Sequence, residues 1–79
     1  MGRNESMSEW ILWSERGPSV EEVRRNNSFI CSDGLSSFVR TYSYRMRGFV
    51  HEMNGREVMD RGIIAWMPLP EPYKEGLQN

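Results

Sequence analysis

The chain has 79 residues, of which 38% are apolar and 27% charged, and its formal net charge is −1. This length fits one domain and excludes a multi-domain enzyme. A chain so short buries only about 60% of its unfolded surface, so we expect a thin core with no cofactor site inside it. The aromatic content of 11% and the low net charge separate the chain from disordered proteins.

The low net charge is a cancellation between segments of opposite sign. Residues 1–23 carry two basic and five acidic side chains, whereas residues 24–61 carry seven basic and four acidic ones. Nine of the ten basic residues are Arg, whose planar fork of donors suits specific interfaces. The single Cys31 excludes an internal disulfide, and with the single His51 it does not complete a four-ligand zinc site.

The first third of the chain predicts a tail, a strand and a helix. Residues 1–8 are polar, and we expect a disordered tail there. Residues 9–13 form an aromatic and aliphatic run that indicates a strand. Ser19 stands three positions before Glu22, which is the spacing of a capping box, so a short helix is predicted over residues 19–25.

The middle of the chain predicts an antiparallel meander. Asp33-Gly34 and Asn54-Gly55 are hairpin signals because both turns favour positive backbone φ angles. The predicted strands are residues 28–31, 36–46, 49–53, 56–59 and 63–67. In the longest of them the even positions carry the larger side chains and are expected to face the core: Phe38, Arg40, Tyr42, Tyr44 and Met46.

Alternating prolines end regular structure at residues 68–72, because proline lacks the amide hydrogen that a sheet needs. The segment from residue 68 to residue 70 is expected to pack across the protein's own sheet, and residues 73–79 are expected to be a disordered tail. We therefore predict a single α+β domain over residues 9–72, with an antiparallel sheet of four or five strands and one short helix. Two sheet edges would be open, so either a monomer or a homodimer is expected.

Two patches at opposite ends of the domain carry a family resemblance. Residues 8–18 contain SEWI and a proline-containing turn, and residues 63–72 end in an unbroken WMPLPEP. This pair resembles the short phage and prophage proteins grouped as domain of unknown function five-five-one. The resemblance implies a phage origin and a small α+β fold, and it supplies no activity. Ala65 stands where that family usually has a histidine, and residues 20–25 replace its glycine-rich turn.

Catalysis is the least favoured class of function, and we predict that the protein is not an enzyme. A nucleophilic Cys or Ser needs a base and an orienting partner, and His51 is the only histidine. Cys31 beside Phe29 and Ile30 is typical of a small buried hydrophobic residue. A small enzyme that uses Cys31 or His51 is kept only as a third hypothesis.

Nucleic-acid binding is the alternative function. Residues 40–47 interleave arginines with aromatic residues, which can neutralise phosphates and stack on bases. The flanking acidic segments argue against a general nucleic-acid binder. A small phage regulator that uses this strand is the rival hypothesis.

Protein binding is the favoured function. Trp and Arg are enriched at interface hot spots, and the chain has three tryptophans. Trp10 and Trp66 are expected in the core, whereas Trp13, on the opposite face of its strand from Trp10, is expected to contact a partner together with Arg40, Arg45 and Arg47. We expect a phage accessory protein that binds and inhibits a host protein or ribonucleoprotein complex, such as a defence system, in the manner of an anti-CRISPR protein.

Two features of the sequence bear on location. The N-terminus has no apolar signal region, and no stretch approaches the roughly 18 apolar residues of a membrane span. We therefore expect no membrane partner and a place in the cytoplasm of the host bacterium.

Overall fold

A computed structural model describes residues 9–70 of the chain. The predicted tails, residues 1–8 and 73–79, and the last two residues of the predicted domain lie outside this range. The described elements are β1 (Ile11–Leu12), α1 (Val20–Arg25), β2 (Ser28–Ser32), β3 (Ser37–Ser43), β4 (Gly48–Met53), β5 (Arg56–Met59) and β6 (Ala65–Pro68).

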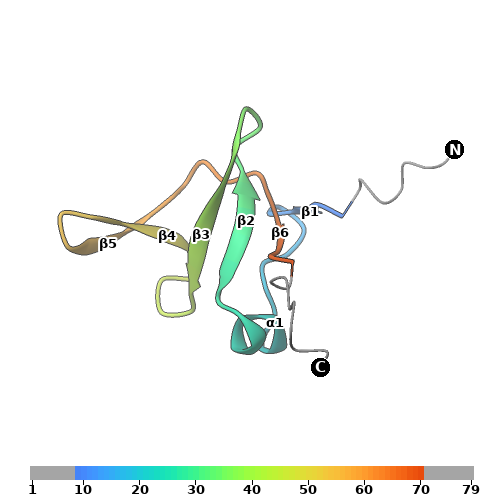
Figure 1. Cartoon of the computed structure of the whole chain (residues 1–79), viewed down its shortest axis with the longest axis horizontal. Coiled ribbons are helices and arrows are strands. Elements are labelled where there is room, and N and C mark those ends of the chain that lie inside the picture. The colour runs from blue at the N-terminus through green and yellow to red at the C-terminus, as the bar shows by residue number, and fades with distance from the viewer. Residues whose placement is uncertain (1–8, 71–79) are drawn as a thin grey trace, which may run out of the picture.

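The strands form one antiparallel sheet in the order β1-β6-β2-β3-β4-β5. Figure 1 shows β2, β3 and β6 in the middle, with the β4–β5 hairpin projecting to one side and α1 beneath the ends of the central strands. The described domain is mostly β, and its six strands exceed the four or five predicted. The difference arises because β6 inserts between β1 and β2, which gives the short β1 a partner.

Local signals for the helix and the hairpins are confirmed. The Ser19 hydroxyl accepts from the Glu22 amide, and the Glu22 carboxylate accepts from the Ser19 amide, so both halves of the capping box are present. Asn54 and Gly55 have φ angles of 53° and 78°, as a two-residue hairpin turn requires. Gly34, in the turn between β2 and β3, has a φ angle of 93°.

The longest predicted strand, residues 36–46, is too long. β3 ends at Ser43, and residues 44–47 form a turn in which Arg47 has a φ angle of 58°. Alternation nevertheless predicts the inner face of β3 correctly, because Phe38 and Tyr42 pack against the buried core. Tyr44 lies in the turn and is 46% exposed, so its predicted place in the core-facing row is wrong.

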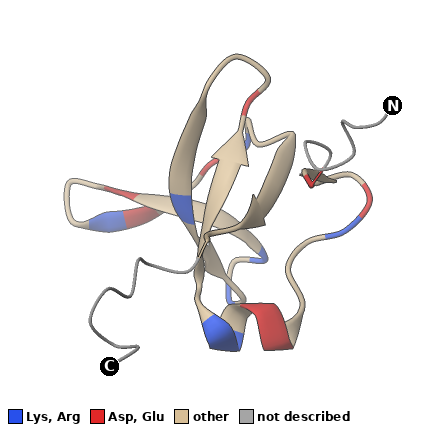
Figure 2. Ribbon diagram, turned by 45° about the vertical axis from the view of Figure 1, so that its right-hand side comes forward, with Lys and Arg blue, Asp and Glu red and all other residues tan. Residues whose placement is uncertain are grey.

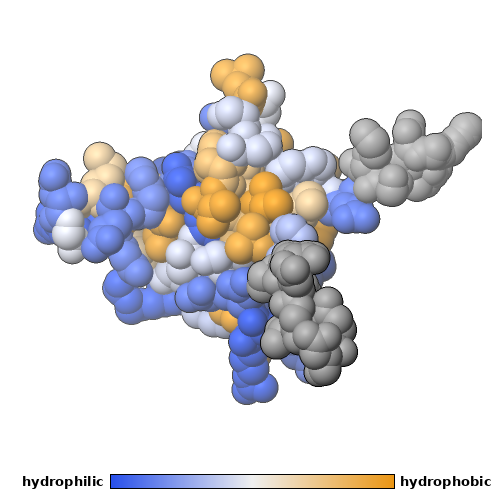
Figure 3. Space-filling model, in the orientation of Figure 1, coloured by the Kyte–Doolittle hydropathy of each residue, from blue (hydrophilic) through white to orange (hydrophobic). Residues whose placement is uncertain are grey.

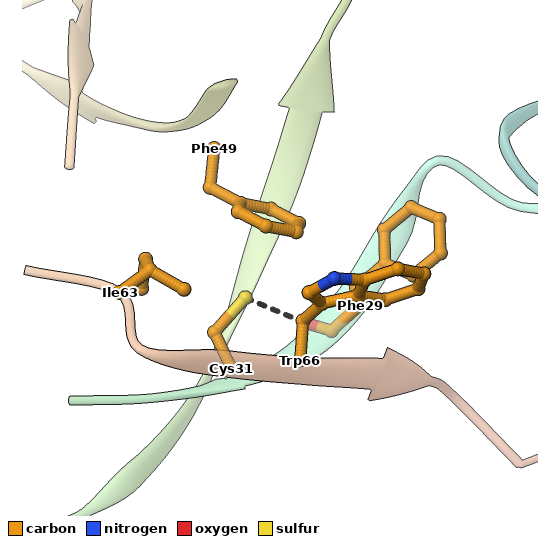
Figure 4. Close-up of a cluster of buried hydrophobic side chains, with 5 residues drawn as sticks. All are labelled: Phe29, Cys31, Phe49, Ile63 and Trp66. Atoms are coloured by element: carbon orange, nitrogen blue, oxygen red, sulfur yellow. Dashed lines mark hydrogen bonds between the residues drawn. The ribbon is translucent and has the colours of Figure 1, made fainter. Parts of the chain in front are cut away.

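The main cluster of buried side chains lies on one face of the sheet and consists of Phe29, Cys31, Phe49, Ile63 and Trp66 (Figure 4). Val50 and Ala65 are also buried, but alternation along their strands places them on the other face. Register places Trp66 beside Cys31, because the two residues stand directly opposite each other on β6 and β2. The Trp66 and Phe29 rings meet edge to face with centroids 5.3 Å apart, an arrangement that aromatic quadrupoles favour. The predicted core position of Trp66 is confirmed, since it is fully buried.

The faces predicted for Trp10 and Trp13 are the reverse of those observed. Ile11 pairs with Trp66 and packs against the core, so alternation along β1 turns Trp10 outward, and Trp10 is 37% exposed. Trp13 lies on the same side as Ile11, with its ring centroid 5.3 Å from that of Phe49. Alternation correctly places Trp10 and Trp13 on opposite faces, but only the long-range pairing of β1 with β6 decides which of these faces is inside.

Candidate binding surface

Arg40 is held by contacts within the protein. Its Nε donates to Asp60 Oδ2 at 2.9 Å, and its guanidinium lies 4.4 Å from the centre of the Phe38 ring. Burial raises the pKa of the Asp60 carboxyl, but hydrogen bonds from the Gly62 amide and from Arg40 outweigh this effect and leave the pKa below its ordinary value. Arg40 and Asp60 therefore form a structural ion pair that joins β3 to the segment after β5.

Arg45 and Arg47 lie in the exposed turn between β3 and β4. Arg45 Nη2 is 3.6 Å from Glu57 Oε1, and the Arg45 side chain is 78% exposed, so this contact is weak. Tyr44, in the same turn, stacks edge to face on Tyr42 with centroids 5.3 Å apart. The structure thus keeps two of the predicted contact residues, Arg45 and Arg47, accessible in one turn.

The four predicted contact residues do not form one continuous surface. Trp13 packs on the core, with Gly17 close beside its ring, and Arg40 is paired with Asp60. Figure 2 shows acidic and basic residues interleaved along the ribbon. Both signs occur even within the short α1, which has acidic residues in its first turn and basic residues in its last turn. Residues 9–70 contain eight basic and eight acidic side chains. The charges of residues 9–70 therefore balance.

A larger exposed feature is the face of the sheet opposite the core. We call it the outer apolar face and define it by five residues whose positions in the sheet direct them away from the core: Trp10, Leu12, Ile30, Val39 and Met67. Ile30 stands opposite both Val39 on β3 and Met67 on β6. Leu12 is 44% exposed and Val39 is 52% exposed. Figure 3 shows hydrophobic residues gathered over the middle strands.

Sequence reasoning missed this face although a signal was present. In residues 28–32 the buried positions are Phe29 and Cys31, yet the outward position between them is the apolar Ile30. On β3 the outward Val39 stands between Phe38 and Arg40, which are turned to the core face and are only partly buried. A strand that is apolar on both faces predicts burial on both faces, whereas here the outer side chains remain partly exposed.

The outer apolar face continues into an acidic cavity between β3, β4 and β5. The cavity holds about 220 Å³ and is lined by Thr41, Val50, His51, Glu52 and Glu57. Thr41 is two residues beyond Val39 on the same face of β3 and pairs with Val50. Glu52 and Glu57 stand directly opposite each other on β4 and β5. The two carboxylates thus stand at the end of an apolar track that begins at β1.

Cys31 lies inside the core. Its side chain is fully buried, and burial raises the pKa of its thiol to about 12. Its Sγ lies 3.8 Å from the Phe29 carbonyl oxygen (Figure 4). Its predicted role as a small buried hydrophobic residue is confirmed.

Within residues 9–70, no group of three or more His, Cys, Asp or Glu side chains is placed to hold a metal ion. The helix α1 has six residues, and no helix in residues 9–70 is long and apolar enough to cross a bilayer.

Comparison with family models, with curated proteins and with solved structures gives no match for this chain. The resemblance of residues 8–18 and 63–72 to domain of unknown function five-five-one therefore stays a prediction.

Proposed function

We propose that this chain is a small phage accessory protein that binds a host protein complex and inhibits it by occupying its surface. The outer apolar face is the observation that carries the proposal. It spans four neighbouring strands, and three of its five apolar side chains, Trp10, Leu12 and Val39, are exposed. Contiguous apolar patches on small domains mark interaction sites. The proposed phage origin and a site of action in the host cytoplasm rest on the WMPLPEP resemblance.

Binding is favoured over catalysis by the state of the candidate nucleophile. Attack by a cysteine requires the thiolate, and a pKa of about 12 keeps the Cys31 thiol protonated at neutral pH. The buried position also denies it a substrate. The defence-system target, as for an anti-CRISPR protein, is the most specific form of the binding proposal.

A nucleic-acid regulator is the second candidate, and the turn at residues 44–47 favours it. This turn presents Tyr44, Arg45 and Arg47 together. Two arginines would neutralise few phosphates, so such binding would have a shallow dependence on salt. Arg40, which the sequence prediction counted as a third contact, is already paired with Asp60.

Affinity capture from host bacterial lysate, with and without nuclease, tests the proposal. The full chain should retain a protein partner after nuclease treatment, whereas Val39→Lys on the outer apolar face should lose it. Leu35→Lys is the matched control, because Leu35 is 94% exposed in the turn between β2 and β3. Loss of all captured material after nuclease would reject the protein-binding proposal and favour the nucleic-acid alternative.

A further inference from the structure

We infer that the outer apolar face and the adjoining acidic cavity together bind a segment of a partner protein that carries apolar side chains followed by a lysine or arginine. This inference rests on the proposed function and names the chemistry of the partner. The observation behind it is the order of side chains across the sheet. Apolar residues occupy β1, β6, β2 and β3, and two carboxylates occupy β4 and β5.

The apolar part of the track fixes where the partner's apolar side chains lie. Ile30, Val39 and Met67 are neighbours across three hydrogen-bonded strands. Adjacent strands are about 4.8 Å apart, so the three side chains form a shallow band that an extended or helical segment can cover. Val39 at 52% exposure is the most accessible of these three, and covering it removes apolar surface from water.

The acidic part of the track fixes the charge of the partner. Glu52 and Glu57 are both exposed and face each other across β4 and β5. Like charges placed directly opposite destabilise a sheet pair, so a basic group of the partner that lies between the two carboxylates relieves their repulsion in the complex. Thr41 and the buried Val50 join the carboxylates to the apolar band. A basic group next to an apolar anchor therefore matches both parts of the surface.

Arg45 already lies near this position. Its Nη2 is 3.6 Å from Glu57 Oε1, a loose contact made by a side chain that is 78% exposed. A basic group of the partner would compete with Arg45 for Glu57. Removal of Arg45 should consequently strengthen the binding of a basic segment, whereas it should weaken binding if Arg45 itself contacts the partner.

Selection of a displayed library of random peptides against the immobilised full chain tests the inference. The enriched peptides should contain apolar residues flanked by Lys or Arg, and higher salt should weaken their binding. Val39→Lys and Leu12→Lys should each lower the affinity by about tenfold or more, and Leu35→Lys should leave it unchanged. Circular dichroism of every variant checks that the fold is kept, and Leu12→Lys provides the test if Val39→Lys does not fold.

Charge variants test the acidic part separately. Glu52→Gln and Glu57→Gln should each lower the affinity for the basic peptides by about two- to fivefold and make this affinity less dependent on salt. Glu21→Gln, in the first turn of α1, is the matched control and should change neither the affinity nor its salt dependence. Arg45→Ala should tighten binding, whereas Arg24→Ala, with the same change in net charge at the other end of α1, should have a smaller effect.

Several outcomes would overturn the inference. Enrichment of acidic peptides would reject the predicted charge of the partner, and so would basic peptides whose affinity is the same for the wild type and both glutamine variants. Either result would leave protein binding through the apolar face intact. Self-association of the free chain that Val39→Lys abolishes would assign the face to a second copy. Nuclear Overhauser contacts between Val39 and residues 71–79 of the free chain would assign it to the protein's own C-terminal segment. The proposed function fails by a different result, namely that the full chain captures no protein partner from lysate after nuclease treatment.

Discussion

Replacing Trp66 by Phe should cost the domain about 2–3 kcal/mol of unfolding free energy. Trp66 is fully buried, and its indole Nε1 donates to the Arg16 carbonyl at 2.9 Å. The smaller ring removes about 40 Å² of buried apolar surface, which corresponds to about 1 kcal/mol. The unpartnered Arg16 carbonyl and the space left behind add about 1–2 kcal/mol. Domains of this size have only about 3–9 kcal/mol in total, so the loss is a large part of the stability.

Urea unfolding followed by far-ultraviolet circular dichroism measures this loss without relying on tryptophan fluorescence. A domain this small has a denaturant slope of about 1 kcal/mol per molar urea, so the midpoint should fall by about 2–3 M while the slope stays constant. Trp10→Phe is the matched control, because Trp10 is 37% exposed and should change stability by less than about 0.5 kcal/mol. Equal losses for the two variants, or a larger loss for Trp10→Phe, would refute the inward assignment of Trp66.

Two further predictions concern ionisable groups. Glu22→Gln should make stability less sensitive to acid, because a bidentate hydrogen bond from Arg16 lowers the pKa of Glu22 from 4.5 to about 2. A lowered pKa gives stability that is present above pH 4.5 and lost as the pH falls toward 2, here at most about 1 kcal/mol because the pair is partly solvated. Urea midpoints of both proteins across this range measure it, and parallel pH profiles would contradict it. Cys31 should resist Ellman's reagent at pH 8 until urea unfolds the chain, because its thiol is buried; prompt labelling of the folded protein would contradict its burial.

Features that depend on neighbouring residues could be predicted from the sequence. The Ser19 and Glu22 capping box and the Asn54-Gly55 turn are correct because each is satisfied by contacts within a few residues. Alternation likewise placed Phe38 on the inner face of its strand. In each case residues close together in the sequence favour one local conformation.

Features that depend on distant partners could not be predicted in this way. The insertion of β6 between β1 and β2 joins segments some fifty residues apart, and it decides that Ile11 rather than Trp10 faces the core. The same limit applies to the predicted contact residues. Arg40 carries the right chemistry for an interface, but Asp60, twenty residues later, folds beside it. Only the assembled sheet shows which arginines stay accessible.

The outer apolar face is not explained by the needs of the sheet alone. Ile30 and Val39 stand directly opposite each other, and a cross-strand pair of this kind stabilises a sheet by about 0.2–1 kcal/mol. Threonine at the same positions would keep the branched shape that strands favour and would leave the surface polar. Met67 and Leu12 have no such branching, yet they extend the apolar band to the edge of the sheet. Exposed apolar surface raises the risk of aggregation, so a band that continues over four strands is better explained by a partner that covers it.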